Sequence, residues 1–464
     1  MGTQISKWLQ LIIISSSVFL AVIDIFIVNL ALPAIKKGID GSDGDIQLII
    51  ALYLLGYATF LITGGRAGDH FGKKRIFIFG MISFTLASTL CGISQTPFQL
   101  NSSRVFQGIS AGFMIPQGIS YIQILFTDIA ERGKAISIYG SIAGAASVIG
   151  QLLGGVLPDL HFYVEGWRLI FLINIPLGII STLLALKFLP NHKNYVKERF
   201  DYSGVFLLTL TLSILIYPMI RGRELGWPLW TIISLSMFFP MLLWFIYNQR
   251  TKLNHQKQPL IDMKLFTFRN FNIALGATLF YFMVQDSYFL INVIVLQTGL
   301  GISSTETGLF FMSQGLGFVT ASLVSARLIP KYGKKVLQVG VFIMIMASGL
   351  HIPLFDTNDV NRPIAYSLLF AYGIGCGTVL PSIMTFALKN IPIKLAGAAS
   401  GAYTTFQQTA IALGIGITGG LFFYLAGDKP SVATYLKAYQ TTMSINMFLL
   451  ILVGFFLSLL PQEK

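Results

Sequence analysis

Long apolar runs alternate with short polar loops along the whole chain. Each of fourteen runs is roughly 20 residues or longer, enough for a helix to cross a ~30 Å hydrocarbon core. A bilayer offers no water to backbone groups, so we expect every run to be helical. Asp24 near the middle of the first run, and the lack of a small-residue cleavage site, argue against a signal peptide. The runs cover residues 10–33, 46–64, 74–94, 100–126, 133–157, 167–189, 203–220, 228–248, 271–298, 307–326, 335–355, 363–388, 395–425 and 440–460.

Composition supports the same interpretation. Of 464 residues, 54% are hydrophobic and 11% charged, and the mean hydropathy is +0.72. A soluble protein carries about 25% charged residues. Cys91 and Cys376 both lie inside apolar runs, which excludes a secreted disulfide scaffold. The chain is predicted to be an all-α, multi-pass integral membrane protein.

The distribution of cations predicts the orientation. With the N-terminus in the cytoplasm, 23 of the 32 Lys and Arg residues fall inside and eight outside, leaving Arg104 within a span. This bias follows the positive-inside rule for an even number of spans, so both termini are expected in the cytoplasm. The net charge of +13 is therefore mainly an orientation signal. We expect no nucleic-acid partner, because no aromatic-interleaved basic patch accompanies it.

An internal repeat divides the chain. The loop from Arg66 to Lys74 resembles the loop from Arg327 to Lys335, an offset of 261 residues, and the same shift carries the first five spans onto the ninth to thirteenth. We predict two pseudo-symmetric six-helix bundles, at 1–200 and 251–464, and a two-helix insert at 201–250. Paired bundles that rock about a central site are a recurring transporter design.

Two acidic residues lie deep within spans. Asp24 and Asp286 each sit about fifteen residues into a run, close to the bilayer midplane at 1.5 Å per residue. A carboxylate there is costly and marks a pathway or a partner. The repeat shift carries Asp24 onto Gln285, next to Asp286, so the two acids are expected in nearly equivalent places. The functional interpretation is proton or cation binding, and the structural alternative is one inter-helix hydrogen bond.

Other polar residues in the spans have two interpretations. Arg104 either reaches the outer interface or faces the interior beside Asp24. Amide side chains at depth are first expected to join helices: Asn29, Gln107, Gln151, Asn174, Asn292, Gln314, Gln407 and Gln408. Six of them, Asn29, Gln107, Gln151, Asn292, Gln314 and Gln407, are secondary cavity candidates. Glycines spaced four apart, as at Gly150 and Gly154, indicate close helix packing or a gate between the halves.

Five motifs in order carry a family resemblance. They are Ile23-Asp-Ile-Phe-Ile-Val-Asn-Leu-Ala-Leu-Pro33, Gly65-Arg-Ala-Gly-Asp-His-Phe-Gly-Lys-Lys-Arg75, Arg104-Val-Phe-Gln-Gly-Ile-Ser-Ala111, Trp167-Arg-Leu-Ile-Phe-Leu-Ile-Asn-Ile-Pro176 and Phe200-Asp201 with Gly204. The chain resembles a major facilitator superfamily transporter of the 14-span drug:proton antiporter branch. It departs from the family pattern at Phe26, at His70 and at Gln151, which stands where the antiporter motif has Pro. Gln151 leaves symport or facilitated movement open.

The resemblance implies roles for particular residues. Asp24 would couple protons to the substrate, and Arg104 would assist proton transfer near it. A gating motif in the cytoplasmic loop would latch that side of the protein, through Gly65, Asp69, Gly72, Lys73, Lys74 and Arg75. The matching position of Asp69 in the second half is Pro330, so the latch is expected to be asymmetric.

The leading prediction is proton-driven efflux of amphipathic, often cationic compounds by alternating access. The alternatives are a dedicated metabolite, peptide or siderophore carrier and, more remotely, a membrane-embedded enzyme or sensor. We expect a monomer in the bacterial cytoplasmic membrane, with protons, small amphipathic substrates and lipid as partners. No cofactor is expected, since the proton gradient supplies the energy.

Overall fold

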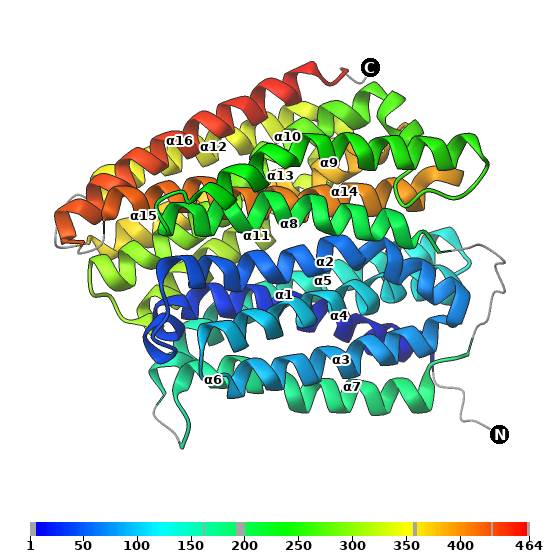
Figure 1. Cartoon of the computed structure of the whole chain (residues 1–464), viewed down its shortest axis with the longest axis horizontal. Coiled ribbons are helices and arrows are strands. Elements are labelled where there is room, and N and C mark those ends of the chain that lie inside the picture. Colours follow the sequence, from blue (N-terminus) through cyan, green and yellow to red (C-terminus); the bar gives the residue numbers. More distant parts are fainter. Residues whose placement is uncertain (1–5, 161–162, 192–199, 356–359, 428–429, 462–464) are drawn as a thin grey trace. The chain divides into compact units, whose positions relative to one another are not determined.

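The computed structural model describes residues 6–160, 163–191, 200–355, 360–427 and 430–461. All regular structure in these ranges is helical (Figure 1), which confirms the predicted fold class. Five of the cations counted above lie outside these ranges: Lys193, Lys197, Arg199, Lys429 and Lys464.

The helices form two compact units. Residues 1–214 and 237–261 belong to the first, and 215–236 and 262–464 to the second. The first unit contains α1 (Lys7–Gly38), α2 (Asp43–Phe71), α3 (Lys73–Ile93), α4 (Pro97–Leu125), α5 (Ile129–Asp159), α6 (Gly166–Leu172) and α7 (Asn174–Phe188). The second contains α10 (Arg269–Ile294), α11 (Ser304–Tyr332), α12 (Lys334–Leu354), α13 (Arg362–Leu388), α14 (Ile393–Gly414), α15 (Gly420–Ala426) and α16 (Val432–Leu459).

The inserted hairpin is divided between the units. It consists of α8 (Tyr202–Glu224) and α9 (Leu229–Asn254), whose residues up to 214 and from 237 belong to the first unit. A short 3-10 turn, Met263–Thr267, follows before α10. The predicted domain boundaries remain a prediction.

The internal repeat is visible in the helix ends. α2 and α11 have 29 residues each, α3 and α12 have 21, and both pairs are offset by 261 residues. Ser42 and Ser303 cap α2 and α11 by accepting a backbone N–H three residues on. Gly72 and Gly333 form the turns between each pair, with φ of +98° and +55°, which other residues rarely adopt. In both units the packing order is also the same: α2 on α4 and α1 on α5, like α11 on α13 and α10 on α14.

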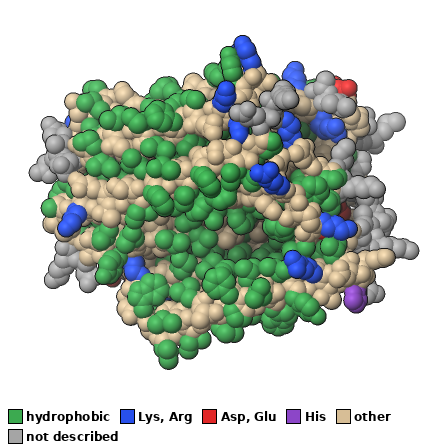
Figure 2. All heavy atoms as spheres, turned by 90° about the horizontal axis from the view of Figure 1, so that it is seen from above, with side chains coloured by type: hydrophobic (Ala, Val, Ile, Leu, Met, Phe, Trp, Pro, Cys, Tyr) green, Lys and Arg blue, Asp and Glu red, His purple; other side chains and the backbone are tan. Residues whose placement is uncertain are grey.

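Thirteen described segments are long and apolar enough to cross a membrane. The remaining predicted span is α4, which is not among them because of its many polar side chains. Asn101, Arg104, Gln107 and Gln117 of α4 are all buried, since α4 packs against α1, α2 and α3. Figure 2 shows hydrophobic side chains over most of one face of the protein, as expected for a surface that contacts lipid.

The offset between the two repeats is not the same along the whole chain. Gly108 lies against the Tyr53 backbone and Gly373 against the Gln314 backbone, so α4 and α13 correspond with an offset of 265. Val295–Gly299, after α10, and Ile415–Gly419, after α14, are single π-helical turns. A π turn adds one residue to a helix.

The first π turn changes the comparison of the two acids. Gly150 lies against the carbonyl of Ile23 and Gly414 against that of Met283, which gives an offset of 260 before the turn. The position that matches Asp24 is then Val284. Asp286 lies two residues further, about 200° around the helix. The two acids are therefore not structurally equivalent, contrary to the expectation from the simple shift.

Candidate functional site

Asp24 and Arg104 form an ion pair inside the first unit. Asp24 lies midway along α1 and is 0% exposed, while Arg104 of α4 is 1% exposed. The Arg104 Nη1 donates to Asp24 Oδ2 at 2.5 Å. Arg104 therefore faces the interior of the unit, which decides between its two predicted positions.

Gln107 completes a three-residue ring of hydrogen bonds. Its Oε1 accepts from Arg104 Nη1 at 2.6 Å, and its Nε2 donates to Asp24 Oδ1 at 2.7 Å. Arg104 Nε also donates to the Ile49 carbonyl at 3.0 Å, and the guanidinium carbon lies 4.3 Å from the centre of the Tyr53 ring. The ring face of tyrosine attracts a desolvated cation. Helices α1, α2 and α4 thus hold Arg104 in one orientation.

Asn174 is a fourth member of the site. α6 ends at Leu172 and α7 begins at Asn174, because Pro176 has no backbone N–H to continue the hydrogen-bond ladder. The Asn174 Nδ2 donates to Asp24 Oδ1 at 3.2 Å and to Ser88 Oγ at 3.0 Å. From sequence, Asn174 was expected only to join helices. Its position in the Trp167–Pro176 motif was the signal that could have identified it.

The charge of Asp24 decides whether the buried charge of Arg104 is compensated. A buried carboxylate and guanidinium compensate each other, whereas removal of one charge leaves the other unpaired in a medium of low polarity. Protonation of Asp24 would do this by removing the anion that Arg104 binds. Asp24, Arg104 and Asn174 bring this dependence to the contact of α1, α4 and α7.

Asp286 has a different environment. It is partly exposed on α10, and it makes no hydrogen bond or ion pair within the described part of the chain. Its neighbour Gln285 accepts a hydrogen bond from Cys376 Sγ at 3.2 Å. With the offset of 265, the position that matches Arg104 is Leu369, so the second unit has no corresponding cation.

The other secondary candidates differ in their surroundings. Asn292 donates to the Tyr288 carbonyl at 2.8 Å and accepts from the Tyr439 hydroxyl at 3.1 Å, as expected for a residue that joins helices. Asn29, Gln151 and Gln314 are buried, and their side-chain oxygens have no hydrogen-bond partner among the described residues. Buried polar groups without partners are uncommon and call for a ligand, water or movement. Gln407 is partly exposed.

The predicted gating motif lies at the turn between α2 and α3. Asp69 forms an ion pair with Lys73 at 2.6 Å, one helical turn away, and Gly72 supplies the turn. Lys74 donates to the carbonyl of Leu186, which joins the loop to α7. Gly65 is in van der Waals reach of Pro116, and Arg75 is exposed.

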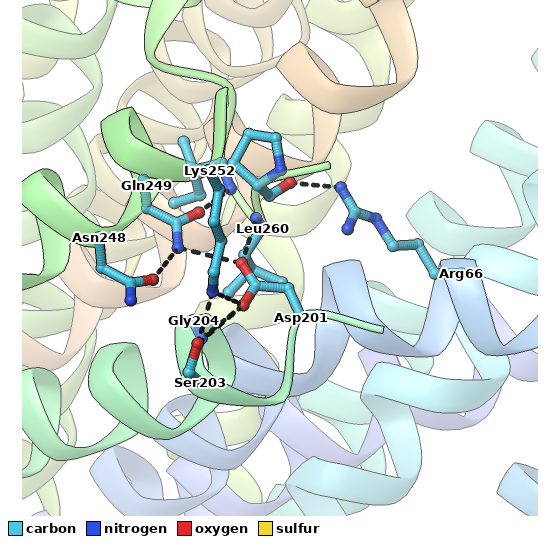
Figure 3. A network of polar contacts seen from close by, with 10 residues as sticks. Arg66, Asp201, Ser203, Gly204, Asn248, Gln249, Lys252 and Leu260 are labelled. Carbon is cyan, nitrogen blue, oxygen red and sulfur yellow. Dashed lines mark hydrogen bonds and ion pairs between the residues drawn. The ribbon is translucent and has the colours of Figure 1, made fainter. Parts of the chain in front are cut away.

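A second buried carboxylate, Asp201, organises the start of the α8–α9 hairpin (Figure 3). Its side chain is 1% exposed and forms an ion pair with Lys252. It also accepts from the Gly204 N–H at 2.7 Å, the Leu260 N–H at 2.8 Å and Gln249 Nε2 at 3.0 Å. Burial raises the pKa of Asp201, but Lys252 and these donors outweigh burial and hold the pKa below its usual value.

The end of α2 also contacts this region. Arg66 Nη2 donates to the Pro259 carbonyl at 2.5 Å (Figure 3), and the His70 and Phe71 rings pack against Phe200. The segment that leads toward α10 is therefore held to the first unit at both Pro259 and Leu260.

The chain is similar to a known protein family and to individual transport and resistance proteins. The family model described as Major Facilitator Superfamily matches residues 14–415. The chain is 31% identical to the probable actinorhodin transporter of Streptomyces coelicolor, over 92% of this chain and 74% of that protein. It is 30% identical to the puromycin resistance protein pur8 of Streptomyces alboniger, over 96% and 89%.

The chain is also similar to a riboflavin transporter and to the solved structure of a sugar symporter. The riboflavin transporter RibZ of Clostridioides difficile is 27% identical over 97% of this chain and 98% of that protein. Among solved structures, that of the D-xylose-proton symporter matches with a TM-score of 0.68 and 13% identity, over 98% of this chain and 97% of that one. The last similarity shows the fold alone.

Proposed function

The chain belongs to the major facilitator superfamily and is a secondary transporter, not an enzyme. From this premise we propose that it exports amphipathic, often cationic compounds by alternating access, in exchange for protons. The observation that carries the proposal is the fully buried Asp24 carboxylate, held by Arg104, Gln107 and Asn174 in the middle of α1. The relative named for resistance to puromycin supports export as the direction.

Asp24 is proposed to carry the coupling proton. A proton that enters from one side neutralises the carboxylate, breaks its pair with Arg104 and changes how α1 packs on α4. Release of that proton on the other side restores the pair. Because Arg104 without its anion is an unpaired buried charge, the protonated state favours a rearrangement of the helices.

Asp286 is proposed to contact the cationic part of the cargo. It is partly exposed and has no cationic partner among the described residues, so its charge is available to a ligand. Asn29, Gln151 and Gln314, with their unpaired side-chain oxygens, are the proposed polar contacts.

The cellular setting is proposed from charge and relatives. The relatives described above are bacterial, which favours the bacterial cytoplasmic membrane. The excess of Lys and Arg in alternate loops favours cytoplasmic termini. We propose that the protein acts as a monomer, with the proton gradient as its energy source and no cofactor.

A dedicated carrier is the second candidate. RibZ matches nearly the full length of both chains, and Gln151 replaces the Pro of the antiporter motif. A specific substrate would need a defined set of polar contacts, whereas a multidrug cavity imposes little shape selection.

Transport in proteoliposomes tests the proposal. Purified protein is given a pH gradient and one of two cargoes, ethidium as a lipophilic cation or riboflavin. Accumulation of ethidium that a protonophore abolishes is expected. Movement of riboflavin alone would support the dedicated carrier, and movement of neither cargo, with no proton flux, would contradict the multidrug proposal.

A further inference from the structure

A groove of about 490 Å³ lies within the second unit, where α11, α12 and α13 meet. Its walls are mainly aliphatic, and Tyr332 and Lys335 stand at one end. Val324 and Val339 line it and are 54% and 58% exposed, so the groove opens on the outer surface of the unit. Because α11, α12 and α13 are long and apolar enough to cross a membrane, a groove with such walls favours acyl chains over water.

The internal repeat explains why the groove exists. At the matching place in the first unit, Phe60 of α2 and Phe113 of α4 fill the space, with ring centres 6.0 Å apart. Their counterparts, with offsets of 261 and 265, are Ala321 and Thr378, and both line the groove. Two large aromatic side chains are thus replaced by small ones, which leaves a channel along the surface.

Among the described residues, no acidic side chain pairs with the cations at the end of the groove. The sequence from 307 to 355 contains no Asp or Glu but has four cations, Arg327, Lys331, Lys334 and Lys335. Pro330 takes the place of Asp69, so the ion pair of the first unit has no counterpart. Lys334 donates to the carbonyls of Ser458 and Leu460. In the described part of the chain, Lys331 and Lys335 make no ion pair.

Helix α12 adds a favourable potential for an anion. It begins at Lys334, directly beside the groove, and its first turn has no side-chain cap. Uncapped N–H groups and the helix dipole favour negative charge there. A phosphate beside Lys335 would lie near this helix end and near Lys331, in the interfacial zone where lipid headgroups lie.

We propose that this groove is a binding site for an anionic phospholipid. One acyl chain lies between α11, α12 and α13 in the space left by Ala321 and Thr378, and the headgroup phosphate binds Lys335 and Lys331. The site is separate from Asp24 and from Asp286, and it does not depend on which cargo the protein carries.

Lipid retention tests the proposal directly. The full-length protein is extracted from nanodiscs that contain equal amounts of phosphatidylglycerol and phosphatidylcholine, and the retained lipids are counted by native mass spectrometry. We expect preferential retention of one phosphatidylglycerol. Lys335→Gln should lower that retention by roughly fivefold, the effect of about one basic residue at an anionic surface.

Two further variants separate the groove from general charge. Ala321→Phe with Thr378→Phe restores the aromatic filling of the first unit, leaves all four lysines and arginines in place, and should also abolish the retained lipid. Lys187→Gln removes an exposed lysine in the last turn of α7, in the first unit, and should change nothing. Equal retention of phosphatidylcholine, or wild-type retention by Lys335→Gln and by the double variant, would overturn the proposal.

Discussion

At the scale of single residues, the Asp24–Arg104 pair is the feature with the largest consequences. Both side chains are almost completely removed from solvent, and their hydrogen bonds reach α1, α2, α4 and α7. A buried pair of this kind adds little net stability but makes each partner dependent on the other. Such dependence suits a switch, because one proton changes the balance.

This dependence predicts a non-additive pair of substitutions. Arg104→Gln leaves the Asp24 carboxylate without its cation and should destabilise the protein by ~3 kcal/mol. Adding Asp24→Asn removes the stranded charge, so the double variant should recover most of the lost stability. Thermal unfolding in detergent, followed for the wild type, both single variants and the double variant, measures the coupling. Additive losses would show that the two residues act independently.

Sequence alone identified Asp24, Arg104 and Gln107 but not how they are connected. An acid deep in an apolar span is conspicuous, because its cost in the bilayer demands a reason. Asn174 is uncharged and carries no such cost. An asparagine that joins helices cannot be told from one that binds a carboxylate by its sequence alone. The structure shows that α7 begins at Asn174 and that the Asn174 side chain donates to Asp24.

At the scale of elements, small residues set how closely α2 and α4 approach. A Cβ at Gly108 would lie 2.0 Å from the Tyr53 carbonyl oxygen, and one at Gly64 would lie 2.1 Å from that of Gly112. Since Tyr53 also stacks on Arg104, this contact positions the guanidinium as well as the helices.

Gly108→Ala should therefore be damaging. The added methyl group would meet backbone, which cannot move as a side-chain end can, at a cost of roughly 1–3 kcal/mol. Gly140→Ala on α5 is the matched control, because a Cβ there has open space around it and alanine favours helix. Unfolding temperature and ethidium transport should both fall for Gly108→Ala alone. Equal behaviour of the two variants would contradict the packing account.

The hairpin entry predicts a pH-dependent stability. Because the folded-state pKa of Asp201 is lowered, its contribution is complete above the unfolded pKa of about 3.9 and is lost as pH falls through the lower folded value. Asp201→Asn should cost about 1–3 kcal/mol at pH 7, since buried donors lose a charged acceptor.

The cost of Asp201→Asn should shrink as the pH falls below the unfolded pKa of about 3.9 and through the lower folded value, because the wild-type carboxyl is then neutralised as well. Unfolding midpoints of both proteins from pH 7 down through this range measure this convergence. Asp40→Asn, which neutralises an exposed carboxyl in the loop after α1, serves as the control. A gap between wild type and Asp201→Asn that stays constant with pH would show that the ion pair contributes nothing.

At the scale of the whole molecule, the repeat and the helix count were accessible from sequence because they depend on hydrophobic length and on loop motifs. The shift of 261 residues held without slippage through α2, α3, α11 and α12. It failed at α10 and α13, because a π turn and a longer loop add residues without changing the apolar pattern. The supposed equivalence of Asp24 and Asp286 failed for this reason.

The central claim is that Asp24 couples protons to transport, and one comparison tests it most directly. Wild type and Asp24→Asn are placed in liposomes, and ethidium movement is measured both with a pH gradient and as exchange at equal pH and equal concentration. We expect the variant to lose accumulation against a gradient but to retain exchange, since Asn has the size and neutral charge of a protonated Asp24 but no proton to release. Undiminished, gradient-driven accumulation by Asp24→Asn would contradict it.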